Sequence, residues 1–194
     1  MEYKVVERDF ISRTLDIVDQ YDALVVKSVP EESRFEVTLL LNCLLGLIVL
    51  PFEHKKRAQG NQRFPEMCQD DLTLIKDLDD QWGLKRLTIV KFKLDGQDVS
   101  FSKVTLRQIV AMIRHAIAHS QFGNGHTQPK PIGTSVDYRD SPVSGVKSQI
   151  TRINFVNKHG STEFEASIAV EDLKLFTTKF ARTVLEEMTD PDCA

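Results

Sequence analysis

An uncharged run of 16 residues, Val37–Phe52, constrains the fold of this chain more than any other segment. A helix needs about 20 apolar residues to span a bilayer, and this run is both shorter and interrupted by Asn42, Gly46 and Pro51. We therefore expect a helix over about 33–51 that other elements bury on nearly all sides. A membrane span is the alternative that we disfavour.

Three further segments carry apolar residues at the spacing of an amphipathic helix. They predict helices over about 7–26, 103–120 and 171–188, and Ser102 is the expected N-cap of the second of these. A short helix is also predicted over about 70–82.

Alternating apolar and polar residues predict two β-hairpins. The first covers about 86–101 and contains the turn signal Asp95-Gly96. The second covers about 150–168 and turns at 157–160. Residues 122–147, rich in Gly, Pro, Ser and Thr, are predicted to form a long connection between helix and hairpin.

These elements predict the fold class. A chain of 194 residues fits one domain of ordinary soluble composition, so we expect a single domain over 1–194. The expected architecture is mainly α: a four-helix up-and-down bundle with small β-hairpin insertions.

The charge balance limits how the chain could bind nucleic acid. A net charge of -3 argues against a grip spread over the whole surface, so RNA binding would need a local basic patch. The candidates are four cations without an acidic residue among them: Lys55, Lys56, Arg57 and Arg63. The alternative is a solvated loop without a specific ligand.

Cysteine usage and the N-terminus bear on the compartment. The three cysteines have no metal-ligand spacing, and Cys43 lies in the apolar run, where a reduced cysteine behaves as a small hydrophobe. The charged N-terminus lacks the apolar stretch of a signal peptide. We therefore expect a cytoplasmic protein without a membrane segment, and no pattern calls for a cofactor.

The predicted helix over 103–120 carries the densest group of cationic and titratable side chains. Its apolar stripe is expected to face the core and consists of Leu106, Ile109, Val110, Ile113, Ala116 and Ile117. His115 and His119, four residues apart, project together from the opposite side, and Arg114 lies on a flank. The small residues Ala111 and Ala118 between them suggest a surface for a second copy of the chain.

These side chains suit cleavage of an RNA phosphodiester without a metal. Histidine takes and gives protons near neutral pH, and the forked donors of arginine match phosphate oxygens. One arginine and two histidines are sparse for this reaction, so symmetric pairing of two such helices would complete the set. Two alternatives remain. His115 and His119 could bind a metal, although no third ligand is evident, or a histidine could simply interact with the carbonyls at the helix end.

The motif resembles that of a known superfamily. Residues Ile113–His119 are similar to the Arg-x4-His motif of HEPN proteins, in which Asn, Asp or His commonly follows the arginine, as His115 does. The order of the predicted helices is also similar, and Leu41–Pro51 resembles plasmid- and defence-borne bacterial HEPN proteins. The resemblance implies a homodimer with a composite, metal-independent ribonuclease site. Arg114 would bind the scissile phosphate, His119 would be the acid or base, and His115 would orient substrate or its partner histidine.

The resemblance also implies a biological setting. Many such proteins are toxins, are paired with a nucleotidyltransferase antitoxin, or act in phage defence. Some carry a tyrosine two residues after the motif histidine, where a partner enzyme modifies it, but this chain has Gln121. The leading hypothesis is thus a dimeric HEPN ribonuclease of a toxin–antitoxin or defence system. The alternative is a non-catalytic HEPN module that binds a nucleotide or a protein.

Overall fold

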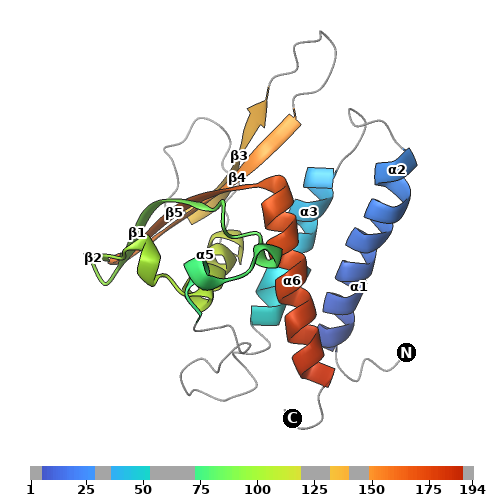
Figure 1. The fold of residues 1–194 in the computed structure, drawn as a ribbon, viewed down its shortest axis with the longest axis horizontal. Helices are drawn as coiled ribbons and strands as arrows, with labels where there is room; N and C mark the ends of the chain where they lie inside the picture. Colours follow the sequence, from blue (N-terminus) through green and yellow to red (C-terminus); the bar gives the residue numbers. More distant parts are fainter. Residues whose placement is uncertain (1–5, 29–35, 53–72, 119–131, 140–148, 190–194) are drawn as a thin grey trace.

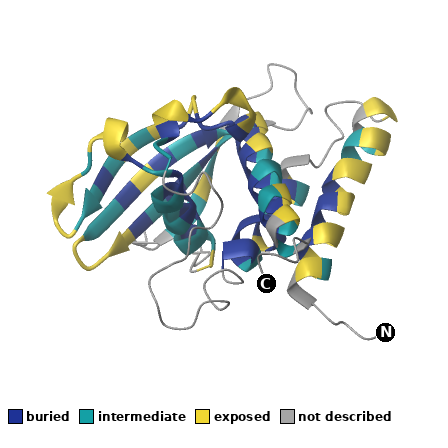
Figure 2. Cartoon of the chain, turned by 60° about the horizontal axis from the view of Figure 1, so that its bottom comes forward, coloured by how far each residue is buried: buried dark blue, intermediate teal, exposed yellow. Residues whose placement is uncertain are grey.

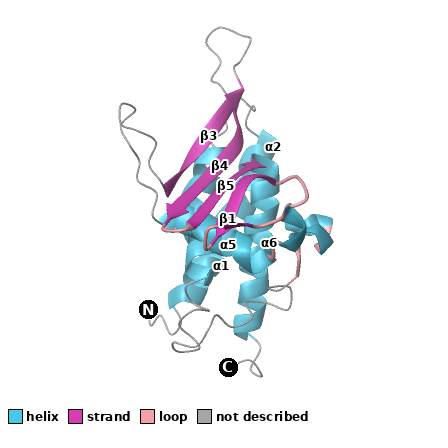
Figure 3. Ribbon diagram, turned by 90° about the vertical axis from the view of Figure 1, so that its left-hand side faces the viewer, coloured by secondary structure: helices cyan, strands magenta, loops and turns pink. Residues whose placement is uncertain are grey.

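A five-stranded antiparallel sheet forms one side of the molecule, and the long helices lie on one face of it (Figures 1 and 3). The computed structural model describes residues 6–28, 36–52, 73–118, 132–139 and 149–189. The helices are α1 (Val6–Gln20), α2 (Val26–Ser28), α3 (Glu36–Leu44), α5 (Leu106–Ala118) and α6 (Val170–Thr189). Five-residue π-helical segments follow α1 (η1, Tyr21–Val25) and α3 (η3, Leu45–Val49). The strands are β1 (Thr88–Leu94), β2 (Gln97–Asp98), β3 (Ile132–Arg139), β4 (Gln149–His159) and β5 (Thr162–Ala169).

The sheet overturns the predicted fold class, because the molecule is not a four-helix bundle with hairpin insertions. Strands lie in the order β2-β1-β5-β4-β3, so both predicted hairpins belong to one sheet. They join where β1 pairs with β5, with Phe92 opposite Phe164. An isolated two-stranded hairpin is marginally stable in water, and this pairing gives each hairpin further hydrogen bonds and a shared apolar face.

Strand β3 lies within the segment that was predicted to be a long connection. It pairs with β4 over its whole length, from Ile132 opposite Asn157 to Arg139 opposite Gln149. Its sequence contains Gly133, Ser135 and Asp137, which are weak strand formers. The hydrogen bonds to β4 override this weak local preference.

Helix α5 lies between the sheet and η3 and contacts β3, β4 and η3. Its predicted apolar stripe faces the core, with five fully buried members: Leu106, Ile109, Val110, Ile113 and Ala116. The predicted N-cap is wrong, because Ser102 lies in a 3-10 turn and the helix begins at Leu106. Thr105 and Gln108 form a capping box instead. The Gln108 N–H donates to Thr105 Oγ1 (3.3 Å), and the Thr105 N–H donates to Gln108 Oε1 (2.9 Å).

The uncharged run forms α3 and η3 and is helical through Phe52. Most of its second half is buried, including every residue from Gly46 to Val49, as its composition requires. Burial raises the pKa of the Cys43 thiol and so disfavours its reactive thiolate. Among the described helices, none has the length and hydropathy needed to cross a bilayer.

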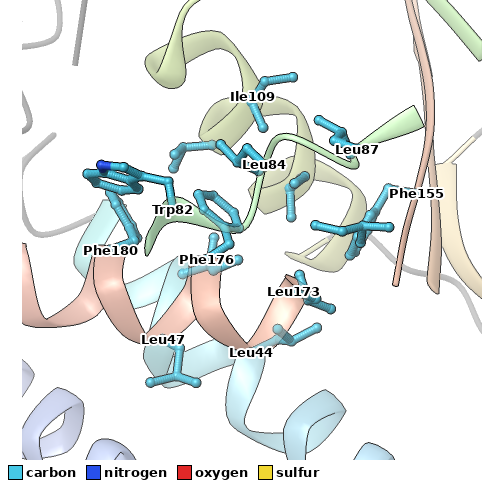
Figure 4. Close-up of a cluster of buried hydrophobic side chains, with 14 of the residues drawn as sticks. Leu44, Leu47, Trp82, Leu84, Leu87, Ile109, Phe155, Leu173, Phe176 and Phe180 are labelled. Atoms are coloured by element: carbon cyan, nitrogen blue, oxygen red, sulfur yellow. The ribbon is translucent and has the colours of Figure 1, made fainter. Parts of the chain in front are cut away.

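The core fills the space between α6, α5 and η3 (Figure 4). Trp82, which is 2% exposed, lies near Phe180 in this cluster. Its local structure differs from the predicted short helix, because the described part of that segment forms two 3-10 turns, Ile75–Asp77 and Asp80–Trp82. Gly83 ends the second turn at φ 64°, and a Cβ there would lie 2.3 Å from the carbonyl oxygen of Asp172 in α6. Glycine is therefore needed where this segment meets α6.

Gly46 sets how closely η3 approaches α1. A Cβ at Gly46 would lie 2.3 Å from Thr14 Oγ1, and the Thr14 hydroxyl donates a 2.7 Å hydrogen bond to the Phe10 carbonyl. We expect Gly46→Ala to lower the free energy of unfolding by about 1–3 kcal/mol, because Thr14 must move and weaken this bond. The higher helix propensity of alanine offsets only about 1 kcal/mol. Urea denaturation measures the change.

The matched control is Gly133→Ala, because a Cβ at Gly133 meets nothing within 4 Å. We expect this control to change the free energy of unfolding by no more than about 0.5 kcal/mol. Equal stability of Gly46→Ala and the parent protein would contradict the close approach of the two helices.

The other face of the sheet is polar, and buried and exposed residues alternate along the strands (Figure 2). On it, Lys91 of β1 and Glu163 of β5 form an ion pair across the junction of the two hairpins. The hydrogen bond from Lys91 holds the pKa of the Glu163 carboxyl below its ordinary value. Because the folded-state pKa is the lower one, the pair stabilises the fold above the unfolded-state pKa, and the effect is lost as pH falls through the folded-state pKa.

We therefore expect Glu163→Gln to be less stable than the parent protein at pH 7, with the difference closing below about pH 4. Urea denaturation across a pH series measures this. Glu165→Gln, one rung away on the same face, is the control and should show a smaller difference at pH 7. A difference for Glu163→Gln that persists unchanged at low pH would contradict the assignment.

Candidate functional site

The structure describes two of the three predicted catalytic residues. Arg114 and His115 lie near the end of α5, and both are half-buried. His119 lies outside the described residues, one position beyond the end of α5. The predicted RNA-binding residues also lie outside the described ranges: Lys55, Lys56, Arg57 and Arg63.

Arg114 points toward the end of the uncharged run. Its guanidinium carbon lies 5.8 Å from the centroid of the Phe52 ring, and Phe52 is itself buried. A guanidinium at this distance over an aromatic face gains a cation–π attraction of about 0.5–2 kcal/mol. The contact joins Arg114 to the layer behind α5 and restricts where its charge can lie.

His115 points in a different direction, toward the sheet. Its ring centroid lies 6.1 Å from that of His159 in β4, and the ring planes are inclined by 50°. The chain's own sheet therefore covers part of the helix side that the sequence assigned to a second copy of the chain. Ala111 is partly buried against the core, whereas Ala118 is exposed.

Sequence reasoning missed Asn157, which lies on the α5-facing side of β4. It is 2% exposed, and its Nδ2 donates to Met112 Sδ at 3.6 Å. Its Oδ1 is buried and has no hydrogen-bond partner among the described residues. The sequence predicts a turn at 157–160, but strand β4 extends through Asn157 and His159. The signal lay in the alternation, because Ile153, Phe155 and Asn157 occupy successive core-facing positions.

The ionisable side chains of α5 itself are all basic. The helix contains Arg107, Arg114 and His115 but no acidic residue. Both glutamates of β5, Glu163 and Glu165, lie on the opposite face of the sheet, where β5 carries them next to Lys91 and Lys93. The end of α5 therefore combines a fixed cation with two imidazoles, a set that suits an anionic ligand.

The geometry of the described residues does not support the alternative of a metal site. Across the described segments, no three His, Cys, Asp or Glu side chains gather closely enough to bind an ion. The groups at the end of α5 can neutralise an anion, donate hydrogen bonds and transfer protons.

The buried amide of Asn157 yields a stability prediction. A buried acceptor without a partner costs about 1–3 kcal/mol, and leucine has the same number of side-chain heavy atoms without that polar group. We expect Asn157→Leu to unfold with an unchanged free energy or one higher by about 1 kcal/mol, and Asn157→Asp to lose about 3 kcal/mol by burying a charge. Urea denaturation tests both.

The control is Asn154→Leu on the outward face of the same strand, where Asn154 donates a 2.8 Å hydrogen bond to Asp137. This change should cost about 1 kcal/mol. If Asn157→Leu were the more destabilising of the two leucine variants, Asn157 would have a structural role that the described contacts do not account for.

The fold and the site together define an α+β domain in which a central helix carries an arginine and a histidine, and the histidine lies against the end of strand β4 of an antiparallel sheet. A protein-family model described as HEPN pEK499 p136 matches residues 1–190, and the chain therefore belongs to this HEPN family. No curated protein and no solved structure gives a significant match.

Proposed function

We propose that this protein is a metal-independent endoribonuclease that acts as a homodimer with a composite Arg-x4-His site. The observation that carries the proposal is the motif from Arg114 to His119, in a chain that matches a HEPN family over 1–190. Helix α5, which carries Arg114 and His115 near its end, contains no acidic residue, and this supports the proposal.

The chemistry follows from the residue types. A base removes the proton of the ribose 2′-OH, whose oxygen attacks the phosphorus while an acid protonates the departing 5′ oxygen. The products are a 2′,3′-cyclic phosphate and a 5′-hydroxyl. In this proposal Arg114 neutralises the phosphorane, His119 transfers a proton, and His115 orients the substrate. A second copy would supply the other proton-transfer group.

We further propose a cellular role in a toxin–antitoxin or phage-defence system, with RNA as the substrate. A nucleotidyltransferase antitoxin is a possible partner in such a system, but Gln121 replaces the tyrosine that such partners modify. The basic cluster Lys55, Lys56, Arg57 and Arg63 would contact the RNA backbone.

The test is cleavage of total RNA by purified protein in EDTA. We expect the parent protein to cut, and Arg114→Ala and His119→Ala each to lower the rate by roughly a hundredfold or more, since they remove charge stabilisation and proton transfer. Arg8→Ala, an exposed arginine of α1, is the matched control and should keep the parent rate. Circular dichroism and unfolding curves show whether the variants are folded.

Other outcomes identify the alternatives. Folded protein that binds RNA or a nucleotide without cutting would contradict the enzyme and favour a non-catalytic binding module. Activity abolished by EDTA and restored by a divalent ion would contradict the metal-independent route. Size-exclusion chromatography with light scattering tests the dimer, and an active monomer would contradict the composite site.

A further inference from the structure

The end of β4 lies beside His115, one of the predicted catalytic residues. Residues 153, 155, 157 and 159 alternate onto the face of β4 that meets α5. Two side-chain contacts follow one another along the interface between β4 and α5. Asn157 Nδ2 contacts Met112 Sδ, and three residues further along α5 the His115 ring lies 6.1 Å from the His159 ring. His159 is thus placed by the same strand–helix packing that places His115.

Exposure separates His159 from the buried residues before it on β4. Phe155 and Asn157 are buried, whereas His159 is exposed, one residue before the tight turn at Gly160. An exposed imidazole at this position contributes little to the core but can reach a ligand that also touches His115.

Two further observations indicate that this end of the sheet is built to meet a polar ligand. Asn157, 2% exposed, carries a buried Oδ1 with no hydrogen-bond partner among the described residues, which is costly in a position that an apolar residue could fill. No acidic side chain occupies the α5-facing positions of β4 or β5 between 153 and 168, so nothing there repels an anion.

We propose that His159 binds the RNA substrate, donating a ring N–H to a phosphodiester oxygen beside His115 of the same protomer. The proposal rests on the proposed function, and it extends the site from one helix to two elements. His159 is then a substrate-binding residue from β4 that the Arg-x4-His motif does not contain.

The first test compares His159→Ala and His159→Gln with Lys158→Ala. Lys158 is the neighbouring exposed residue on the opposite face of β4, so it controls for loss of a nearby positive group. In a His119→Ala background, binding of a short single-stranded RNA is measured by fluorescence anisotropy. We expect His159→Ala to weaken binding roughly ten- to hundredfold, the range for a lost charge-assisted hydrogen bond, with partial recovery in His159→Gln.

The remaining outcomes of this test each decide the proposal. Unchanged binding in His159→Ala, or an equal loss in Lys158→Ala, would overturn it. If the fold-changes of His115→Ala and His159→Ala multiply in the double variant, the two rings contact the RNA independently and do not share one phosphodiester, which would also overturn it. A double variant no weaker than the worse single variant supports it.

A second measurement separates this inference from the ribonuclease proposal. Histidine ring signals are followed by NMR in the parent protein as a non-cleavable single-stranded oligodeoxynucleotide is added. Joint movement of the His115 and His159 signals supports the site even if the protein never cuts RNA, a result that would overturn only the proposed reaction. RNA cleavage without movement of the His159 signal would overturn the inference and leave the reaction standing.

Discussion

Burial of α5 on two sides is the constraint on which the rest of this structure depends. Its apolar stripe packs into the core, and η3 on one side and strands β3 and β4 on the other complete its surroundings. A helix that is buried on two sides needs a packing layer on each of them, so the sheet is required to cover α5. The pairing of β1 with β5 widens that layer and places the polar face of both hairpins toward the opposite side.

The same packing assembles the candidate site where the two layers meet. Phe52, at the end of the uncharged run, lies beneath the Arg114 guanidinium, and β4 brings His159 to His115. Adjacent residues of one helix turn thus reach two different layers. The motif is local in sequence, but the surface around it is composed of segments more than a hundred residues apart.

Asn157 shows how stability and function can oppose each other in this region. Its neighbours along β4 on the core-facing side are Ile153 and Phe155, and an apolar residue would satisfy the packing better than a buried amide oxygen without a partner. Natural sequences tolerate such a cost mainly where binding or catalysis requires it. The chain belongs to the HEPN family, and we propose that its functional site lies at this end of α5 and includes the end of β4.

The sequence by itself determined the four long helices and the two hairpins, and it supplied the residues of the motif. Helical periodicity and turn signals depend on residues a few positions apart, so the stripe from Leu106 to Ala116 and the turn at Asp95-Gly96 could be read directly. Only the tertiary structure decided the features that depend on strand pairing. These are the order of the strands in the sheet, the presence of β3, and the position of Asn157 and His159 beside α5. The hydrogen-bond partners of a strand lie far away in sequence, and local composition does not identify them.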